Sequence, residues 1–287
     1  MTIIGVGLIG GSLGLALRKR GLAGRVVGVG RDPERLEEAR RLGAIDEGTT
    51  ELADGLAGAS VAVVCTPVNR LPEIVIEAAK VGPNEILLTD AGSTKRALVE
   101  RVEADPGACS RFVGAHPIAG SERSGVANAR DDLFEGQTCV LTRTSRTPPE
   151  RFRRAEAFWS SVGSRIMVMS PSEHDLALAM TSHLPHVAAS ALASVVDPAV
   201  LGLAAGGYRD GTRVAGADPD LWTAIYLDNR RPLMETLDRY LDRLASFRDA
   251  LRDADAERIQ QFSREARENR AVFDRLQTEC RSPIFCP

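Results

Sequence analysis

The sequence predicts an α/β protein, with a doubly wound parallel sheet over residues 1–169 followed by an all-helical domain over residues 170–287. Two observations predict this arrangement. Short apolar runs alternate with helical patterns as far as Met169, which is typical of a parallel sheet covered by helices. From Ser170 onward we find only helical periodicity. The length of 287 residues is sufficient for two domains.

The composition is that of an ordinary globular protein, with 44% hydrophobic and 26% charged residues. A formal net charge of -3 provides no basic field for nucleic acid or an anionic membrane. The most apolar stretch, residues 184–196, is too short to span a bilayer, and no export signal precedes the first strand. The five cysteines form no CxxC pair, which favours reduced thiols. We therefore expect a cytoplasmic protein.

A G-x-G-x-x-G motif lies between the first apolar strand and the first helix. Its first glycine allows a tight turn, its second lets the backbone approach a pyrophosphate, and its third lets the helix pack on the strand. The N-terminus of the helix then offers free N–H groups to the phosphates. Because a second strand follows at residues 26–29, we expect a dinucleotide-binding domain of the Rossmann type. The expected cofactor contacts are Gly5, Gly7, Leu8, Ile9 and Gly10.

The end of the second strand bears on the choice of cofactor. Gly30 stands where an acid is expected to bind a ribose, and Arg31 follows it. A small residue followed by arginine suits a 2′-phosphate, because a guanidinium binds phosphate with two hydrogen bonds. Asp32 lies close enough to reach a ribose hydroxyl, but Asp32-Pro33-Glu34 also predicts a helix N-cap. We predict NADP or NAD, with NADP favoured.

Two further strands are predicted at residues 61–65 and 85–89. In an open α/β sheet, the ends of such strands line the binding crevice. Ser93, in the loop after the second of them, is interpreted as the N-cap of the next helix or as a catalytic hydroxyl, and both roles are compatible. The candidate cofactor contacts at these strand ends are Cys65, Thr66, Pro67 and Asp90.

His116 follows a strand predicted at residues 111–115 and precedes a loop that contains Pro117, Gly120 and Gly125. This pattern indicates a buried parallel strand that ends at the edge of a site. Imidazole is the side chain best suited to proton transfer near neutral pH. A histidine bound beneath a loop is the alternative interpretation. Further on, the sequence predicts strands at residues 138–141 and 165–169 with a helix between them.

The helical domain begins with a capping box at residues 170–173. His183 and His186 are three residues apart and share a helix face, and Pro185 is expected to kink that helix. No metal is predicted, because no third ligand has convincing spacing. Residues 206–213 predict a polar loop, whose two arginines suit a dicarboxylate or are solvated surface charge.

The last part of the chain is predicted to be helical throughout. Asp218-Pro219 caps a helix that places Trp222 in its first turns. Residues 231–276 predict two amphipathic helices, whose apolar faces form core or a subunit interface.

From residue 3 to about residue 230, the chain resembles the prephenate/arogenate dehydrogenases. The most specific motifs of this resemblance are the loop that contains His116-Pro117 and the segment Ser182-His183-Leu184-Pro185-His186. The residues that carry the resemblance are Gly5-x-Gly7-Leu8-Ile9-Gly10-Gly11-Ser12, Thr89-Asp90-x-Gly92-Ser93-Thr94-Lys95, Gly114-x-His116-Pro117-x-Ala119-Gly120-x-Glu122-x-Ser124-Gly125, Ser182-His183-Leu184-Pro185-His186 and Tyr208-Arg209-Asp210-x-Thr212-Arg213.

The resemblance implies oxidative decarboxylation of prephenate to 4-hydroxyphenylpyruvate in tyrosine biosynthesis, or of arogenate to tyrosine, with hydride transfer to NAD(P)+. It implies a homodimer formed by the helical domain. We expect neither a regulatory ACT module after that domain nor a chorismate mutase segment before the chain. The departure from the family pattern is Gly30, where members that prefer NAD carry Asp.

The resemblance also implies residue roles. His116 would be the hydrogen-bond acceptor and base, Ser93 would orient the same hydroxyl, and Arg213 would bind the ring carboxylate. Glu122 stands where the family often has an acid, which would pair with the ammonium of arogenate or gate the pocket. The other implied substrate contacts are Ser121, Ser182, His183, His186, Arg209 and Trp222.

Three other functions fit the sequence less well. A dehydrogenase of the hydroxyacid or imine-reductase type usually places a lysine in the helical domain, whereas the last lysine here is Lys95. A dinucleotide-sensing dimer without activity would not need His116, Ser93 and Arg213 together. A Ser-His-Asp hydrolase drawn from Ser182, His183 and Asp175 lacks a nucleophile elbow.

Overall fold

The computed structural model describes residues 1–121 and 123–281, with the side chains of residues 277–281 left aside. The chain forms two compact units, one from Met1 to Leu233 and one from Met234 onward. The first unit contains every strand of the described residues. The second contains most of the last two helices.

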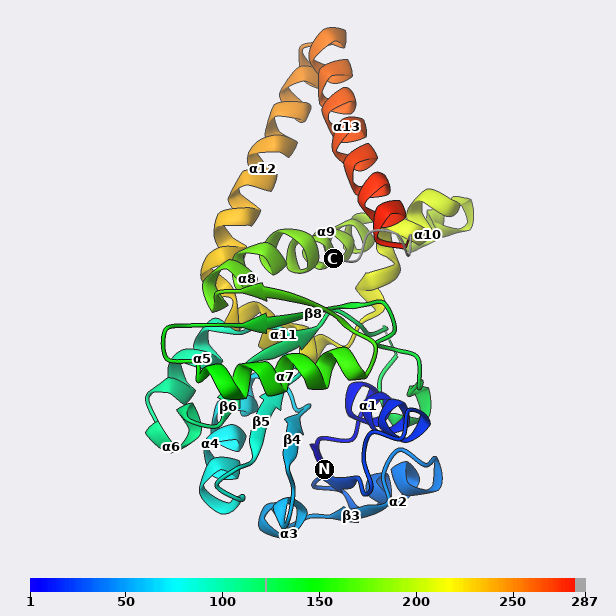
Figure 1. Cartoon of the computed structure of the whole chain (residues 1–287). Coiled ribbons are helices and arrows are strands. Elements are labelled where there is room, and N and C mark those ends of the chain that lie inside the picture. The colour runs from blue at the N-terminus through cyan, green and yellow to red at the C-terminus, as the bar shows by residue number, and fades with distance from the viewer. Residues whose placement is uncertain (122, 282–287) are drawn as a thin grey trace. The chain divides into compact units, whose positions relative to one another are not determined.

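A six-stranded parallel sheet forms the centre of the first unit, with strand order β3-β2-β1-β4-β5-β6 (Figure 1). The order reverses between β1 and β4, which is where open α/β sheets bind ligands. Ile4 pairs with both Val29 and Val64, so the carboxyl ends of β1, β2 and β4 lie level at this point. The strands are β1 Thr2–Ile4, β2 Val27–Val29, β3 Glu47–Thr49, β4 Val61–Val64, β5 Leu87–Asp90 and β6 Phe112–Val113.

Helices cover both faces of this sheet, which confirms the predicted doubly wound fold. One core cluster contains Leu13, Leu36 and Trp159, from α1 (Leu8–Lys19), α2 (Pro33–Arg41) and α7 (Pro149–Ser161). A second cluster joins side chains from helices on the opposite face. Those helices are α3 Leu52–Leu56, α4 Leu71–Val81, α5 Arg96–Glu103 and α6 Pro106–Cys109.

The strand predicted at residues 111–115 is divided between two sheets. After β6 the chain turns away at Gly114 and enters a small sheet of β7 (Ala115–Pro117), β8 (Thr138–Thr142) and β9 (Arg165–Met169). There β7 is antiparallel to β8, and His116 pairs with Val140. A Cβ on Gly114 would lie 2.4 Å from Thr142 Oγ1, so this crossing requires glycine. The prediction that His116 ends a parallel strand was therefore wrong.

Both helix caps that the sequence predicted between β9 and the second unit are present. The capping box at Ser170 is present, with Ser170 and Glu173 each bound to the other's backbone. A π-helical turn, Ala179–His183, precedes Pro185, which has no N–H to donate to the preceding turn. Asp218 caps its helix as predicted. The helices are α8 Pro171–Leu178, α9 Leu184–Val195, α10 Gly206–Thr212, α11 Pro219–Asp228 and α12 Arg230–Arg252, and α12 continues into the second unit.

The loop predicted at residues 206–213 is the short helix α10. Two of its glycines, Gly206 and Gly207, lie in the first turn, where the cost of glycine is smallest. The side chain of Thr212 bonds back to the carbonyl of Tyr208 and closes the last turn. The glycine count therefore misled the prediction, because only Gly211 lies further inside the helix.

One helical stretch of the described residues, Pro171–Val195, is long and apolar enough to cross a membrane by length and composition alone. It carries His174, Asp175 and His183, which are all buried within the first unit. Asp175 also binds the backbone of Lys95 and Arg96. Only 22% of its apolar window is buried in the single chain.

The second unit consists of the rest of α12 and of α13 (Ala256–Arg281), which confirms the two helices predicted at residues 231–276. They meet near their connection, where the rings of Phe247 and Phe262 are 4.9 Å apart. Farther from it, Leu241, Leu244 and Phe273 are exposed in the single chain.

Candidate active site

The glycine motif forms a turn that leaves room for a ligand. Gly5 has φ +94°, and a Cβ there would lie 2.8 Å from the carbonyl oxygen of Cys65. A Cβ on Gly10 would lie 2.2 Å from the carbonyl oxygen of Gly5. Around Gly7, the N-cap of α1, the space that a Cβ would take is open. Internal packing therefore requires Gly5 and Gly10, whereas Gly7 borders a space at a helix N-terminus that fits a pyrophosphate. Leu8 and Ile9 begin that helix.

At the end of β2, the two candidate cofactor-selecting side chains differ in their surroundings. Asp32 is the N-cap of α2, and its Oδ1 accepts hydrogen bonds from the N–H groups of Glu34 and Arg35. Arg31 is exposed. A Cβ on Gly30 would lie 3.2 Å from a methyl group of Leu36, so only a flexible side chain limits the space there. The predicted helix cap at Asp32 is confirmed.

Thr66, two residues after the end of β4, carries an unsatisfied polar atom. Its Oγ1 is buried and has no hydrogen-bond partner in the described part of the chain. Its methyl group lies 3.1 Å from the Cβ position of Gly5, so it is next to the glycine turn. Cys65 and Pro67 flank it in the same connection. A buried hydroxyl without a partner at this edge fits a site that a polar ligand completes.

Asp90 is fully buried and binds the backbone of the segments around the site. Its Oδ1 accepts a hydrogen bond of 2.9 Å from the N–H of Ala115, and its Oδ2 accepts one of 2.8 Å from the N–H of Gly92. Its carboxylate also pairs with the buried ammonium of Lys95. These contacts hold β7 against the end of β5 and leave Asp90 no surface toward the cofactor.

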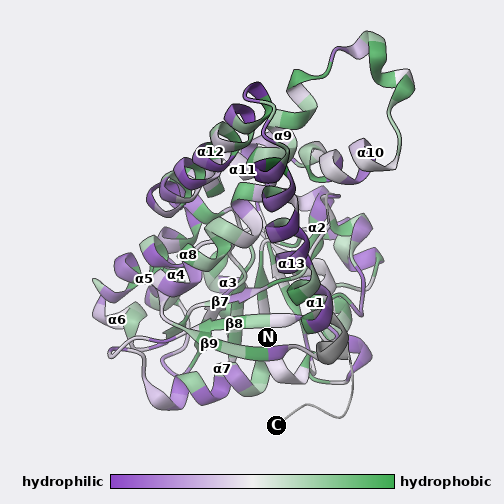
Figure 2. Cartoon of the chain, turned by 90° about the horizontal axis from the view of Figure 1, so that it is seen from above, coloured by the Kyte–Doolittle hydropathy of each residue, from purple (hydrophilic) through white to green (hydrophobic). Residues whose placement is uncertain are grey.

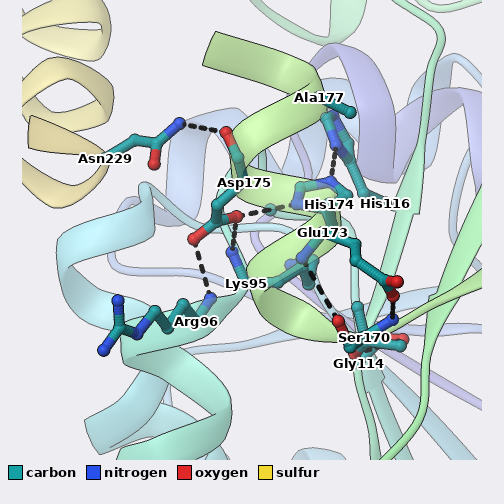
Figure 3. A network of polar contacts seen from close by, with 12 residues as sticks. Lys95, Arg96, Gly114, His116, Ser170, Glu173, His174, Asp175, Ala177 and Asn229 are labelled. Atoms are coloured by element: carbon teal, nitrogen blue, oxygen red, sulfur yellow. Dashed lines mark hydrogen bonds and ion pairs between the residues drawn. The ribbon is translucent and has the colours of Figure 1, made fainter. Parts of the chain in front are cut away.

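A chain of hydrogen bonds runs from Asp175 through His174 to His116 (Figure 3). His116 Nδ1 and His174 Nε2 are 2.8 Å apart, and His174 Nδ1 and Asp175 Oδ1 are 2.7 Å apart. All three side chains are buried. His116 Nε2 makes no hydrogen bond with the described residues. Of the four ring nitrogens of His116 and His174, it is therefore the one that remains for a ligand.

Asp175 also caps helix α5 from outside that helix. Its two carboxylate oxygens accept hydrogen bonds of 2.8 and 2.9 Å from the N–H groups of Lys95 and Arg96. The N-cap residue of α5 is Lys95, whose side chain makes no cap bond. The interpretation of Ser93 as the N-cap was therefore wrong, because Asp175 supplies the cap. The Ser93 hydroxyl has no hydrogen-bond partner among the described residues and remains available to a substrate.

Burial lowers the pKa of both histidines of this hydrogen-bonded chain, and hydrogen bonds lower the pKa of its aspartate. The pKa of His116 is well below 6.5, first because of burial and then because of His174, Lys95 and His183. Burial also lowers the pKa of His174, against the opposing effect of Asp175. Burial alone would raise the pKa of Asp175, but hydrogen bonds from His174, Arg96 and Lys95 outweigh it, so this pKa is lowered.

Aromatic side chains gather beside these groups. The ring of Trp222 stacks on that of His186 at 3.5 Å between centroids and meets His183 edge to face at 6.0 Å. Asn229 donates hydrogen bonds to His183 Nδ1 and to the carbonyl of Asp175. Burial lowers the pKa of His183 to about 4. The structure therefore brings His116, His183, His186 and Trp222 into one region.

The remaining predicted substrate contacts are placed less uniformly. Arg213 is close enough to His186 to lower the pKa of that ring, although burial of the ring lowers it more. The side chain of Arg209 is 80% exposed and lies 3.5 Å from Asp210, so the structure does not bring it to the histidines. Ser182 is half-buried in the π-helical turn, and the exposed Ser121 binds the backbone of Arg123. Glu122 lies outside the described residues.

Within residues 1–121 and 123–281, no three side chains of His, Cys, Asp or Glu are arranged to hold a metal ion. The histidines instead bind one another, carboxylate, amide and backbone groups.

Sequence reasoning missed His174, Asp175 and Asn229 as parts of the site. One signal was present. The helix that begins at Arg96 has Lys95 at its N-cap position, and lysine is a poor N-cap, so a cap from another element was to be expected. Nothing local identifies Asp175 as that cap, 79 residues further along the chain from Arg96.

Two family models match the chain. One, described as prephenate dehydrogenase, nucleotide-binding domain, matches residues 13–168. The other, described as prephenate dehydrogenase, dimerization domain, matches residues 170–265. Together they cover His116, His174 and Asp175, whereas the glycine turn lies just before the first of them.

Individual proteins are similar over nearly the whole chain. The prephenate dehydrogenase of Bacillus subtilis (strain 168) is 32% identical over 277 residues, which are 94% of this chain and 75% of that protein. The structure of A. aeolicus prephenate dehydrogenase with hydroxyphenyl propionate and NAD+ has a TM-score of 0.86 at 33% identity, covering 94% of this chain and 97% of that one. Synechocystis arogenate dehydrogenase has a TM-score of 0.79 at 28% identity, covering 95% and 99%.

Proposed function

The chain belongs to the prephenate dehydrogenase family, and from this premise we propose that it oxidises and decarboxylates prephenate to 4-hydroxyphenylpyruvate with NAD(P)+. The observation that carries the proposal is the buried His116, which is held at Nδ1 and free at Nε2. It lies on β7, which contacts the end of β5 in the dinucleotide-binding sheet. A neutral base at this place suits the oxidation of a hydroxyl group.

NAD(P)+, when bound, accepts a hydride from the ring carbon that bears the 4-hydroxyl. His116 Nε2 accepts the hydroxyl proton as that carbon becomes a carbonyl. Loss of CO2 from the ring carboxylate then makes the ring aromatic, and His116 returns the proton to the phenolate oxygen. Ser93 orients this oxygen, and Arg213 binds the ring carboxylate. The pyruvyl end is proposed to contact Ser182, His183, His186 and Arg209, with Trp222 nearby, and Ser121 is a further proposed substrate contact. Glu122 is proposed to pair with the ammonium of arogenate or to gate the pocket.

Arogenate is the alternative substrate, since the similar Synechocystis protein is named an arogenate dehydrogenase. Steady-state assays of prephenate and arogenate, each with NAD+ and with NADP+, test the proposal directly. We expect turnover of prephenate with a kcat/KM above that for arogenate. Turnover of neither substrate with either cofactor would remove the proposal.

Replacing Arg213 with Ala should raise the KM for prephenate by about ten- to a hundredfold, with a smaller effect on kcat. A charge-assisted contact is worth roughly 1.5–3 kcal/mol, and one that forms before the transition state is lost mainly from binding. Arg209→Ala is the matched control, since Arg209 is 80% exposed on the helix that ends just before Arg213, and it should change KM less. An unchanged KM in Arg213→Ala would place the ring carboxylate elsewhere.

We propose that NADP is preferred to NAD. Support comes from Gly30, which carries no charge against a 2′-phosphate, and from Asp32, whose Oδ1 is occupied at the start of α2. Arg31→Ala should then raise the Kd for NADP by about ten- to a hundredfold and the Kd for NAD far less. Arg35→Ala is the control, because Arg35 pairs with Asp32, and it should leave the preference unchanged. If the wild type prefers NAD and Arg31→Ala alters neither Kd, Asp32 is the ribose ligand.

The pH profile tests the state of the base. Only neutral His116 accepts a proton, and its pKa lies well below 6.5 because of burial and of His174, Lys95 and His183. We therefore expect kcat/KM to stay constant as the pH falls from about 8 through 6.5 and to decline only well below that value. A decline centred at or above 6.5 would mean that the group titrating in catalysis is not a buried His116.

We propose a homodimer formed through the helical region, as the description of the second family model supports. Apolar residues of the first unit are available for it. Val195 is 77% exposed and Leu203 is 88% exposed, and Figure 2 shows the apolar segments of the connection between α9 and α10. The exposed Leu241, Leu244 and Phe273 of the second unit are further candidates.

The proposed domain boundary remains between residues 169 and 170. The two family models divide the chain there, whereas the compact units divide after Leu233 because α8 to α11 pack in the first unit. The free thiols of Cys65, Cys109 and Cys139 support the proposed cytoplasmic location.

A further inference from the structure

We propose that His174, anchored by Asp175, is a positioning residue that fixes His116 in the tautomer with its proton on Nδ1 and its lone pair on Nε2. This inference deepens the proposed function and rests on it for its kinetic consequence. It also predicts the state of the resting protein, which is measurable without any substrate.

The anchor is the carboxylate of Asp175. It accepts hydrogen bonds from the N–H groups of Lys95 and Arg96 and from His174 Nδ1. Asn229 holds the backbone carbonyl of the same residue. An ionised carboxylate has no hydrogen to donate, so His174 Nδ1 must be the donor in its bond of 2.7 Å.

The protonation pattern of both rings follows from this donor. A neutral imidazole carries one proton, so a proton on His174 Nδ1 leaves Nε2 as an acceptor. The atom 2.8 Å from it is His116 Nδ1, which must then carry the proton of its own ring. The two rings meet edge to face at 66°, with the nitrogen of one directed at the nitrogen of the other. His116 Nε2 is left with a lone pair.

The other tautomer of His116 would be inactive as a base. It would present an N–H at Nε2, and a protonated Nε2 cannot accept the proton of a substrate hydroxyl. It would also place two lone pairs against each other between His116 and His174. Because both rings are buried, no bulk water relieves that repulsion, so His174 determines which nitrogen faces the substrate.

Two amide substitutions at position 174 separate the two bonds of this ring. In a glutamine side chain the amide reaches the place of Nε2, and in an asparagine side chain it reaches only the place of Nδ1. His174→Gln therefore keeps an acceptor for His116 and loses the contact with Asp175. His174→Asn keeps the contact with Asp175 and loses the hydrogen bond to His116. Both variants remove the buried imidazole, so each controls for the other.

We expect His174→Asn to lower kcat by about 10–100-fold, the usual effect of removing a group that orients a reacting histidine. The KM for substrate and the Kd for dinucleotide should stay near their wild-type values. His174→Gln should keep most of the wild-type kcat. Equal losses in the two variants, or a loss confined to KM, would overturn the proposal.

Nitrogen NMR of the resting wild-type protein with 15N-labelled histidine gives the second test. The chain has four histidines, and the signals that disappear in His116→Asn belong to His116. We expect a protonated Nδ1 and an unprotonated Nε2 for this ring. A proton on Nε2, or a mixture of both tautomers, would overturn the proposal even if the His174 variants fail to fold. This measurement needs no turnover, so absence of prephenate or arogenate oxidation would remove the proposed function and leave this result standing.

Discussion

His116→Asn should lower kcat by about 10²–10⁴-fold, the usual contribution of a positioned base. Asparagine reaches the place of Nδ1 and keeps a hydrogen bond toward His174, but it has no group at the place of Nε2 that accepts a proton. Because His116 is buried and bound to His174 alone among side chains of the described residues, the fold and the dinucleotide site should be retained. Steady-state kinetics and a dinucleotide titration measure the two quantities separately.

His186→Asn is the comparison for that variant. Its ring stacks on Trp222 at 3.5 Å and bonds to the carbonyl of Ser182, so its loss should change substrate KM more than kcat. A wild-type kcat in His116→Asn would show that the proton leaves by another route. Loss of dinucleotide binding in the same variant would show that His116 supports the sheet rather than the reaction.

Asp175→Ala should destabilise the protein by about 2–6 kcal/mol. It leaves the buried N–H groups of Lys95 and of the His174 ring without their acceptor, and each buried donor without a partner costs roughly 1–3 kcal/mol. The part-buried N–H of Arg96 loses the same acceptor. For a chain of this size, we expect Tm to fall by roughly 5 °C or more. Thermal unfolding monitored by circular dichroism measures this. At a temperature where the variant is folded, kcat should also fall, since His174 loses its anchor.

Asp32→Ala is the matched control for the stability effect. Asp32 also caps a helix with its carboxylate, but it caps its own helix at an exposed position. Loss of such a cap costs about 0.5–2 kcal/mol. An equal loss of stability in the two variants would show that the bonds of Asp175 to α5 contribute no more than a helix cap at the surface.

The features that could be predicted from the sequence depend on residues close together in the chain. The glycine turn, the cap at Asp32 and the capping box at Ser170 each involve side chains and backbone within a few positions. The alternation of strands and helices was sufficient for the doubly wound sheet. His116 was found because a histidine between an apolar run and a glycine-rich loop is a local pattern.

The features that were missed depend on contacts between distant segments. Residues 111–116 look like one strand, and only the approach of Gly114 to Thr142 shows where the chain leaves the first sheet. Ser93 looked like a helix cap because the competing carboxylate, that of Asp175, belongs to another helix. His174 faces His116 across 58 positions of sequence, and no local pattern connects them.

The carboxylate of Asp175 makes the first turn of α5 and the proposed base, His116, parts of one cooperative element. Its Oδ1 accepts hydrogen bonds from the amide of Lys95 and from His174, and its Oδ2 accepts one from the amide of Arg96. A local opening that frays this turn removes two of the three hydrogen bonds that hold the Asp175 carboxylate, so it loosens the anchor of His174. The hydrogen-exchange rates of these two amides therefore report how often that anchor loosens in the resting protein.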